Sequence, residues 1–116
     1  MPFKNILVIF LMLFSVNSYA AEPERPTEEE AAAALGALLN LPAAILKDAT
    51  VKLGTCIPVE NASHKGQIAC TAALMVGAGS SETQADFYRD PKQADRWAAQ
   101  PSQSQDQLPF PDPKLY

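Results

Sequence analysis

The sequence predicts a small all-α domain: a bundle of four to five short helices with one disulfide bond and a disordered, proline-rich C-terminal tail. Three observations lead to this prediction. A run of three glutamates is followed by an alanine-rich stretch within residues 27–39, which is typical of a helix start. As a helix, residues 67–78 would be apolar on nearly every face, which is expected of a central helix in a bundle. From Gln100 onwards the chain is rich in proline, glutamine and serine and has no helical period.

The first twenty residues have the pattern of a cleavable export signal. Lys4 precedes an apolar run over residues 6–14, and Ser18 and Ala20 supply the small residues that signal peptidase requires. The apolar run is too short to span a membrane, which takes about 20 residues. The sequence therefore predicts cleavage after Ala20 and a periplasmic product, with secretion beyond the cell left open.

Charge and length limit what residues 21–116 can do. We expect one domain, made of a flexible arm at 21–26, a helical body at 27–100 and a tail at 101–116. Loss of Lys4 with the leader changes the net charge from −4 to −5. An acidic chain is a poor ligand for nucleic acid, so a basic protein partner is better suited. After cleavage no apolar run approaches membrane-spanning length, and no membrane span is expected.

Two helices are predicted before the first cysteine. The first covers residues 28–39, because Thr27 and Glu30 form a capping box ahead of the leucines. The second covers residues 42–53, starting at Pro42, which is favoured at a first helical position. The apolar stripes of these helices contain Leu35, Leu38 and Leu39 in the first, and Ile45, Leu46, Ala49 and Leu53 in the second.

Three further helices are predicted in the second half. The apolar stretch 67–78 is the central one. Ser81 and Gln84 form a second capping box for a helix over 82–89, and Asp90-Pro91 is typical of the start of another over 91–99. Large apolar side chains at helical spacing either fill the core or line a pocket for a hydrophobic small molecule; they are Met75, Phe87 and Trp97.

The two cysteines, Cys56 and Cys70, predict a disulfide bond, since an even cysteine count in an exported chain favours pairing. Closing a loop of this length removes roughly 3 kcal/mol of denatured-state entropy. A zinc site with His64 as a third ligand is disfavoured, because the spacing lacks two close ligand pairs. We expect no metal and no cofactor.

No pattern of catalytic residues is present. His64 is the single histidine, and it lies in a predicted loop without a G-x-S-x-G motif. The carboxylates outside helix caps and tail are Glu60, Glu82 and Asp86, and nothing places two of them in an apolar cleft. The sequence therefore predicts a non-enzyme.

The tail carries the partner-binding prediction. Leu108, Phe110, Leu115 and Tyr116 combine apolar contact area with stiff prolines, which lower the entropy lost on binding. Such a segment could bind another protein, lie back across its own domain, or have no role. The predicted function is a non-catalytic periplasmic protein-interaction module, for example an accessory of an envelope-spanning secretion or conjugation machine. The alternatives are an inhibitor or immunity protein against a cell-wall-degrading enzyme, and a small hydrolase.

Overall fold

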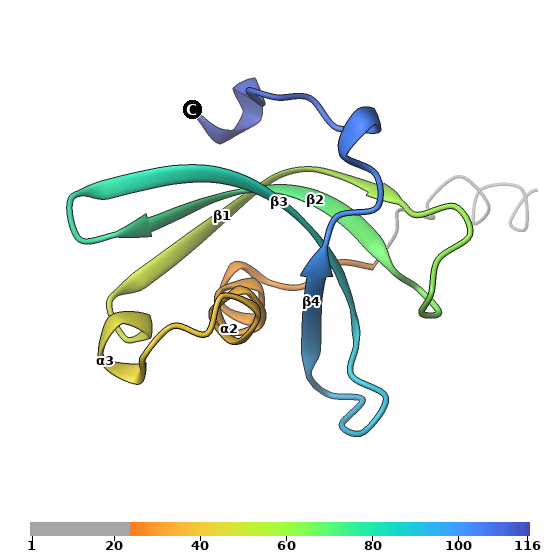
Figure 1. Cartoon of the computed structure of the whole chain (residues 1–116), viewed down its shortest axis with the longest axis horizontal. Coiled ribbons are helices and arrows are strands. Elements are labelled where there is room, and N and C mark those ends of the chain that lie inside the picture. Colours follow the sequence, from red (N-terminus) through yellow and green to blue (C-terminus); the bar gives the residue numbers. More distant parts are fainter. Residues whose placement is uncertain (1–23) are drawn as a thin grey trace, which may run out of the picture.

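The computed structural model describes residues 24–116, so the predicted leader lies outside the described residues. Four antiparallel strands form one sheet in the order β1-β2-β3-β4, each beside its neighbour in the sequence (Figure 1). The chain is β-rich, and the all-α prediction is wrong. The elements are α2 (Glu28–Leu38), α3 (Ala43–Leu46), β1 (Ala49–Pro58), β2 (Ile68–Val76), β3 (Gly79–Arg89), β4 (Trp97–Pro101) and the 3-10 turns η1 (Gln105–Gln107) and η2 (Pro113–Leu115).

Helix α2 begins where the sequence predicts. The Thr27 hydroxyl accepts a hydrogen bond from the Glu30 N–H, and the Glu30 carboxylate accepts one from the Thr27 N–H, which completes the capping box. The helix ends at Leu38, one residue before the predicted end, and Asn40 then adopts a left-handed backbone with φ of 57°. Local signals are sufficient here because the cap and the alanine run lie in one continuous segment.

The predicted helix over 42–53 is wrong beyond its first turn. Only α3, four residues long, is helical, and β1 begins at Ala49. Thr50 and Val51 are β-branched and favour an extended strand over a helix. The strand is held by antiparallel pairing with β2 that the local sequence does not reveal.

The predicted central helix over 67–78 is strand β2, which pairs with β1 on one side and β3 on the other. Its first six residues, from Ile68 to Ala73, are all buried. Because both faces of this strand are covered, its sequence lacks the alternation of polar and apolar residues that marks a half-exposed strand. A short run of this kind resembles a buried helix.

The predicted helices over 82–89 and 91–99 are also wrong. Strand β3 follows β2 through a tight turn in which Gly77 has a φ of 58°, as hairpin turns require of a glycine. Asp90-Pro91 starts a loop, in which the Asp90 carboxylate accepts a hydrogen bond from the Lys92 N–H. Strand β4 then begins at Trp97.

The main core lies between the sheet and helix α2. The sheet bends around the helix, so that both outer strands, β1 and β4, contact it (Figure 1). From the helix, Ala31, Ala34 and Leu35 are buried in this core. The sheet residues that meet them alternate along the strands, as the two-residue period requires; they include Val51, Ile68, Cys70, Ala72, Ala85, Phe87 and Trp97.

The opposite face of the sheet is covered by residues 102–116 (Figure 1). Leu108 and Leu115 are buried, and so are the small residues Ala69 and Ala73 that β2 presents on this side. The prediction of a disordered tail is therefore wrong. Of the three outcomes considered for this segment, packing against its own domain is the one observed.

No helix within residues 24–116 could serve as a membrane span. The longest, α2, has 11 residues, whereas a span takes about 20.

Candidate functional site

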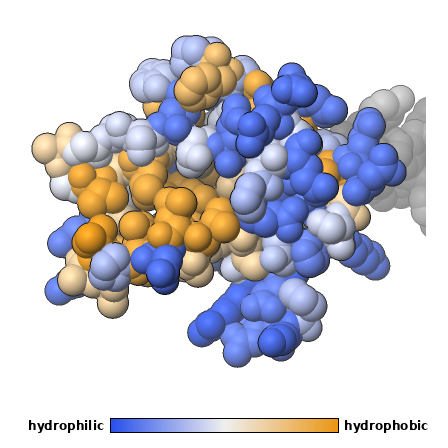
Figure 2. Space-filling model, in the orientation of Figure 1, coloured by the Kyte–Doolittle hydropathy of each residue, from blue (hydrophilic) through white to orange (hydrophobic). Residues whose placement is uncertain are grey.

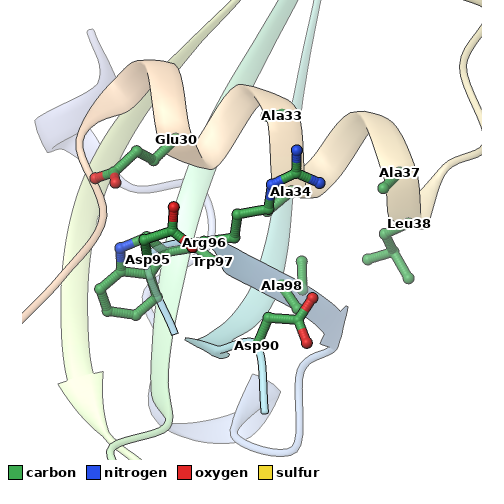
Figure 3. A pocket seen from close by; sticks show the side chains of 11 residues that line it. Glu30, Ala33, Ala34, Ala37, Leu38, Asp90, Asp95, Arg96, Trp97 and Ala98 are labelled. Carbon is green, nitrogen blue, oxygen red and sulfur yellow. The ribbon is translucent and has the colours of Figure 1, made fainter. Parts of the chain in front are cut away.

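Helix α2 lies between the two edges of the bent sheet and leaves a groove on each side. The α2–β1 groove has a volume of about 400 Å³ and is lined by apolar residues of α2, α3 and β1, with Glu28 and Glu29 as its charged residues. The α2–β4 groove is larger, about 600 Å³. It is shown in Figure 3 and is lined by Glu30, Ala33, Ala34, Ala37, Leu38, Asp90, Asp95, Arg96, Trp97, Ala98 and Ala99.

Trp97 is the central side chain of the α2–β4 groove. It is only 8% exposed, and the Arg89 guanidinium lies 4.4 Å from the centre of its ring, in cation–π geometry. Arg89 in turn forms an ion pair with Glu24, which ties the start of the described chain to this side of the sheet. The Arg89 guanidinium therefore covers one face of the indole ring.

The indole nitrogen of Trp97 is buried and has no hydrogen-bond acceptor among the described residues. In the view of Figure 3 this nitrogen lies on the edge of the ring turned toward Glu30. A buried donor without a partner costs about 1–3 kcal/mol. This nitrogen is closed off from solvent, so an acceptor brought by a bound molecule would recover the free energy once the side chains that cover it have moved.

Acidic side chains surround the groove. Glu30, Asp90 and Asp95 line it together with one cation, Arg96. One carboxylate oxygen of Glu30 accepts the capping hydrogen bond from the Thr27 N–H, and one carboxylate oxygen of Asp90 accepts a hydrogen bond from the Lys92 N–H. The Asp95 side chain makes no hydrogen bond within the described residues. Arg89, which lies over the Trp97 ring, is paired with Glu24 and adds no net charge. The lining side chains therefore leave an excess of negative charge, which favours a cationic group over an anionic one.

A second surface lies at the end of α2 and in α3. Leu39 is 49% exposed and Ile45 is 40% exposed, and Leu41 between them is half-buried. We call these three residues the α2–α3 apolar surface. Figure 2 shows hydrophobic residues gathered over this part of the molecule and the adjoining sheet.

The predicted disulfide bond is confirmed. Cys56 of β1 and Cys70 of β2 are direct partners across the two strands, with their Cα atoms 4.1 Å apart. The bond joins neighbouring strands, not a loop to a helix as the all-α prediction implied. It lies beside the main core, to which Cys70 belongs.

The four predicted partner-binding residues of the C-terminal segment differ in exposure. Leu108 and Leu115 are 7% and 6% exposed, so their side chains are used within the fold. Phe110 and Tyr116 are 68% and 80% exposed, and the Tyr116 hydroxyl donates to Glu82. A role of this segment in partner binding stays a prediction, and it would rest on Phe110 and Tyr116.

Asp112 anchors the C-terminal segment to the sheet. Its carboxylate is 1% exposed and accepts hydrogen bonds from the Thr71 hydroxyl at 2.6 Å and the Thr55 N–H at 2.9 Å. Gly54 makes this approach possible, because a Cβ there would lie 2.6 Å from Asp112 Oδ2. Burial by itself raises the pKa of Asp112, but these hydrogen bonds and one from the Lys114 N–H outweigh it and lower the pKa to about 2.

The lowered pKa of Asp112 predicts a pH dependence of stability. A carboxyl with a lower pKa in the folded chain stabilises the fold above its unfolded pKa of about 4, and this contribution is lost as the pH falls toward 2. We expect the free energy of unfolding to fall more steeply across this range in the native chain than in Asp112→Asn. Urea denaturation between about pH 2 and pH 6 measures the difference, and parallel curves for the two proteins would contradict it.

The candidate catalytic residues make no direct hydrogen bond with one another within residues 24–116, and Gln67 lies between two of them: it accepts from the His64 N–H and donates to Asp86. His64 is half-buried and stacks on Tyr88 with ring centroids 3.7 Å apart. Asp86 is completely buried and accepts from Gln67, while Glu82 accepts from the C-terminal segment. Within residues 24–116 no group of three or more histidine, cysteine or acidic side chains is arranged to hold a metal.

The sequence did not predict either groove. The sequence indicates Met75, Phe87 and Trp97 for a core or a pocket. In the structure Phe87 is buried in the core, Met75 is exposed, and Trp97 lines the α2–β4 groove. The sequence indicates a role for Glu30 only in a helix cap. A groove between α2 and β4 joins segments about sixty residues apart, which no local pattern can reveal.

Comparison of the chain with protein-family models, with curated proteins and with solved structures found no match.

Proposed function

We propose that this chain is a non-catalytic protein-interaction module of the periplasm, which binds a protein partner through the α2–α3 apolar surface. The exposure of Leu39 and Ile45 is the observation that carries the proposal. Both side chains lie within seven residues at one end of the molecule. An envelope-spanning secretion or conjugation machine is a suitable setting for such an accessory.

The apolar character of this surface supports a protein partner. Covering an exposed leucine or isoleucine contributes roughly 25 cal/mol for each Å² of apolar surface removed from water. Leu39 and Ile45 are not part of the core. Helix α2 contributes Ala31, Ala34 and Leu35 to the core instead. A grouped apolar surface of this kind is typical of a contact site.

The charge of the chain supports a basic partner. The net charge is −4 for the whole chain, and the adjoining α2–β1 groove carries Glu28 and Glu29. Opposite charge on the partner would raise the association rate and disfavour wrong partners.

Partner capture tests this proposal. The full-length chain and the double variant Leu39→Asp/Ile45→Asp are expressed with their own leader, and proteins bound to each are identified from a periplasmic extract by mass spectrometry. We expect one specific partner, confirmed by reciprocal capture, whose recovery falls about tenfold with the double variant. Buried contact residues of an interface typically produce losses of this size.

Phe110→Asp is the comparison variant, because it also puts a charge on an exposed apolar residue but tests the contact predicted in the C-terminal segment. If the partner binds the α2–α3 apolar surface, recovery with Phe110→Asp should be unchanged. Loss with Phe110→Asp alone would move the contact to the C-terminal segment, and equal recovery with all three proteins would refute the proposal. A cell-wall-degrading enzyme as the partner would identify the chain as an inhibitor.

A further inference from the structure

The α2–β4 groove has two features that a merely structural gap does not require. One is the Trp97 indole N–H, buried and without an acceptor among the described residues. The other is the excess of acidic side chains that line the groove, where three carboxylates stand against the one guanidinium of Arg96. The first calls for a hydrogen-bond acceptor and the second for a positive charge.

The shape of the groove restricts the ligand further. Its helix wall consists of small side chains, Ala33, Ala34 and Ala37, and it ends at Leu38. From Glu30 to Leu38 the helix rises by about 12 Å, at 1.5 Å a residue. This length matches three to four residues of extended chain. The acidic side chains Glu30 and Asp95 lie beside Trp97, and the apolar residues Ala37 and Leu38 lie at the other end (Figure 3).

We infer that the α2–β4 groove binds a basic peptide segment of the protein partner. A lysine or arginine side chain of this segment lies near Glu30 and Asp95. Side chains that cover Trp97 Nε1 move aside, and a backbone carbonyl of the segment then accepts a hydrogen bond from this nitrogen. The next apolar residue of the segment lies against Leu38. This inference rests on the proposed partner-binding function and names the chemistry of the partner.

A second copy of the chain fits the groove poorly. Its own surface is acidic, with thirteen Asp and Glu against nine Lys and Arg in the whole chain. In a two-fold symmetric pair both copies use the same surface, so the acidic lining of one groove would face the acidic lining of the other. Like charges at that distance oppose association.

Trp97 also reports on the groove directly, because it is the single tryptophan of the chain. The probe is a capped hexapeptide that contains two lysines and one leucine, and its control has glutamates in place of the lysines. We expect the lysine peptide to change the fluorescence of Trp97 saturably and to shift the single indole N–H resonance in a ¹⁵N-labelled chain. Added salt should weaken this binding, since it screens exposed charges.

Asp95→Lys tests the role of charge. Asp95 is exposed in the loop before β4, so the substitution should leave the fold intact. We expect the affinity for the lysine peptide to fall about fivefold and that for the glutamate peptide to rise, as reversal of a rim charge predicts. Asp95→Asn should lie between the two. Asp106→Lys makes the same charge change in η1 and should have no effect.

Three results would overturn the inference. They are equal binding of the lysine and glutamate peptides, no change in the Trp97 signals at millimolar lysine peptide, and an unaltered affinity in Asp95→Lys. The outcome is independent of the partner-capture test, because that test depends on Leu39 and Ile45. A chain that captures its partner but fails to bind the lysine peptide would refute the groove site alone.

Discussion

Replacement of Phe87 by alanine should lower the free energy of unfolding by about 4 kcal/mol. Phe87 is completely buried near the C-terminal end of β3 and belongs to the core between the sheet and helix α2. Its neighbours there include alanines from both α2 and the sheet, and these are too small to fill the space left by the ring. Urea denaturation followed by circular dichroism measures the loss, with the disulfide bond intact in both proteins.

Phe110→Ala is the control for this prediction. The same side chain is removed, but Phe110 is 68% exposed. Its loss should change the free energy of unfolding by no more than about 0.5 kcal/mol. Similar effects of the two substitutions would contradict the placement of Phe87 in the core.

The second large effect is expected for Asp112→Ala, at about 3 kcal/mol. The substitution removes a buried carboxylate that accepts hydrogen bonds from Thr55, Thr71 and Lys114, and hydrogen bonds to a charged group are worth about 1.5–3 kcal/mol each. It also releases the segment that covers the second face of the sheet. Urea denaturation measures the loss of stability, and carboxypeptidase digestion measures release of residues 102–116.

Asp106→Ala provides the comparison, because Asp106 is an exposed acid of the same segment. It should alter neither the free energy of unfolding nor the rate of digestion. Rapid digestion of both variants, or of neither, would show that Asp112 does not hold the segment in place.

Helix α2 and the disulfide bond could be predicted because each depends on few residues. Thr27 and Glu30 lie three positions apart and cap the helix through their own side chains. The pairing of Cys56 with Cys70 could be predicted from the even cysteine count together with the expectation that the chain is exported. Neither inference required knowledge of what lies beside these residues in space.

The strands could not be distinguished from helices in the same way. Residues 68–73 are buried on both sides, by α2 and by the C-terminal segment, so no alternation marks them as strand. Their alanines favour a helix when the residues are considered in isolation. Pairing with β1 and β3 outweighs that preference, and both partners lie elsewhere in the chain.

The tail and the candidate site show the same limit. A run of prolines and polar residues is typical of a disordered segment, yet Leu108, Asp112 and Leu115 are buried against the sheet. The hydrogen bonds that hold Asp112 come from Thr55 and Thr71, which lie 57 and 41 residues earlier in the chain. The α2–β4 groove likewise exists only because Glu30 and Trp97 are brought together by the bend of the sheet.

The sequence by itself determined the start of one helix, the pairing of the cysteines and the acidic character of the surface, since these follow from neighbouring residues or from composition. The tertiary structure alone decided that the apolar stretches are strands, that the tail covers the sheet and that a tryptophan lines a groove. These features depend on hydrogen bonds and burial between distant segments, whose free energy exceeds local conformational preferences of a few tenths of a kcal/mol a residue.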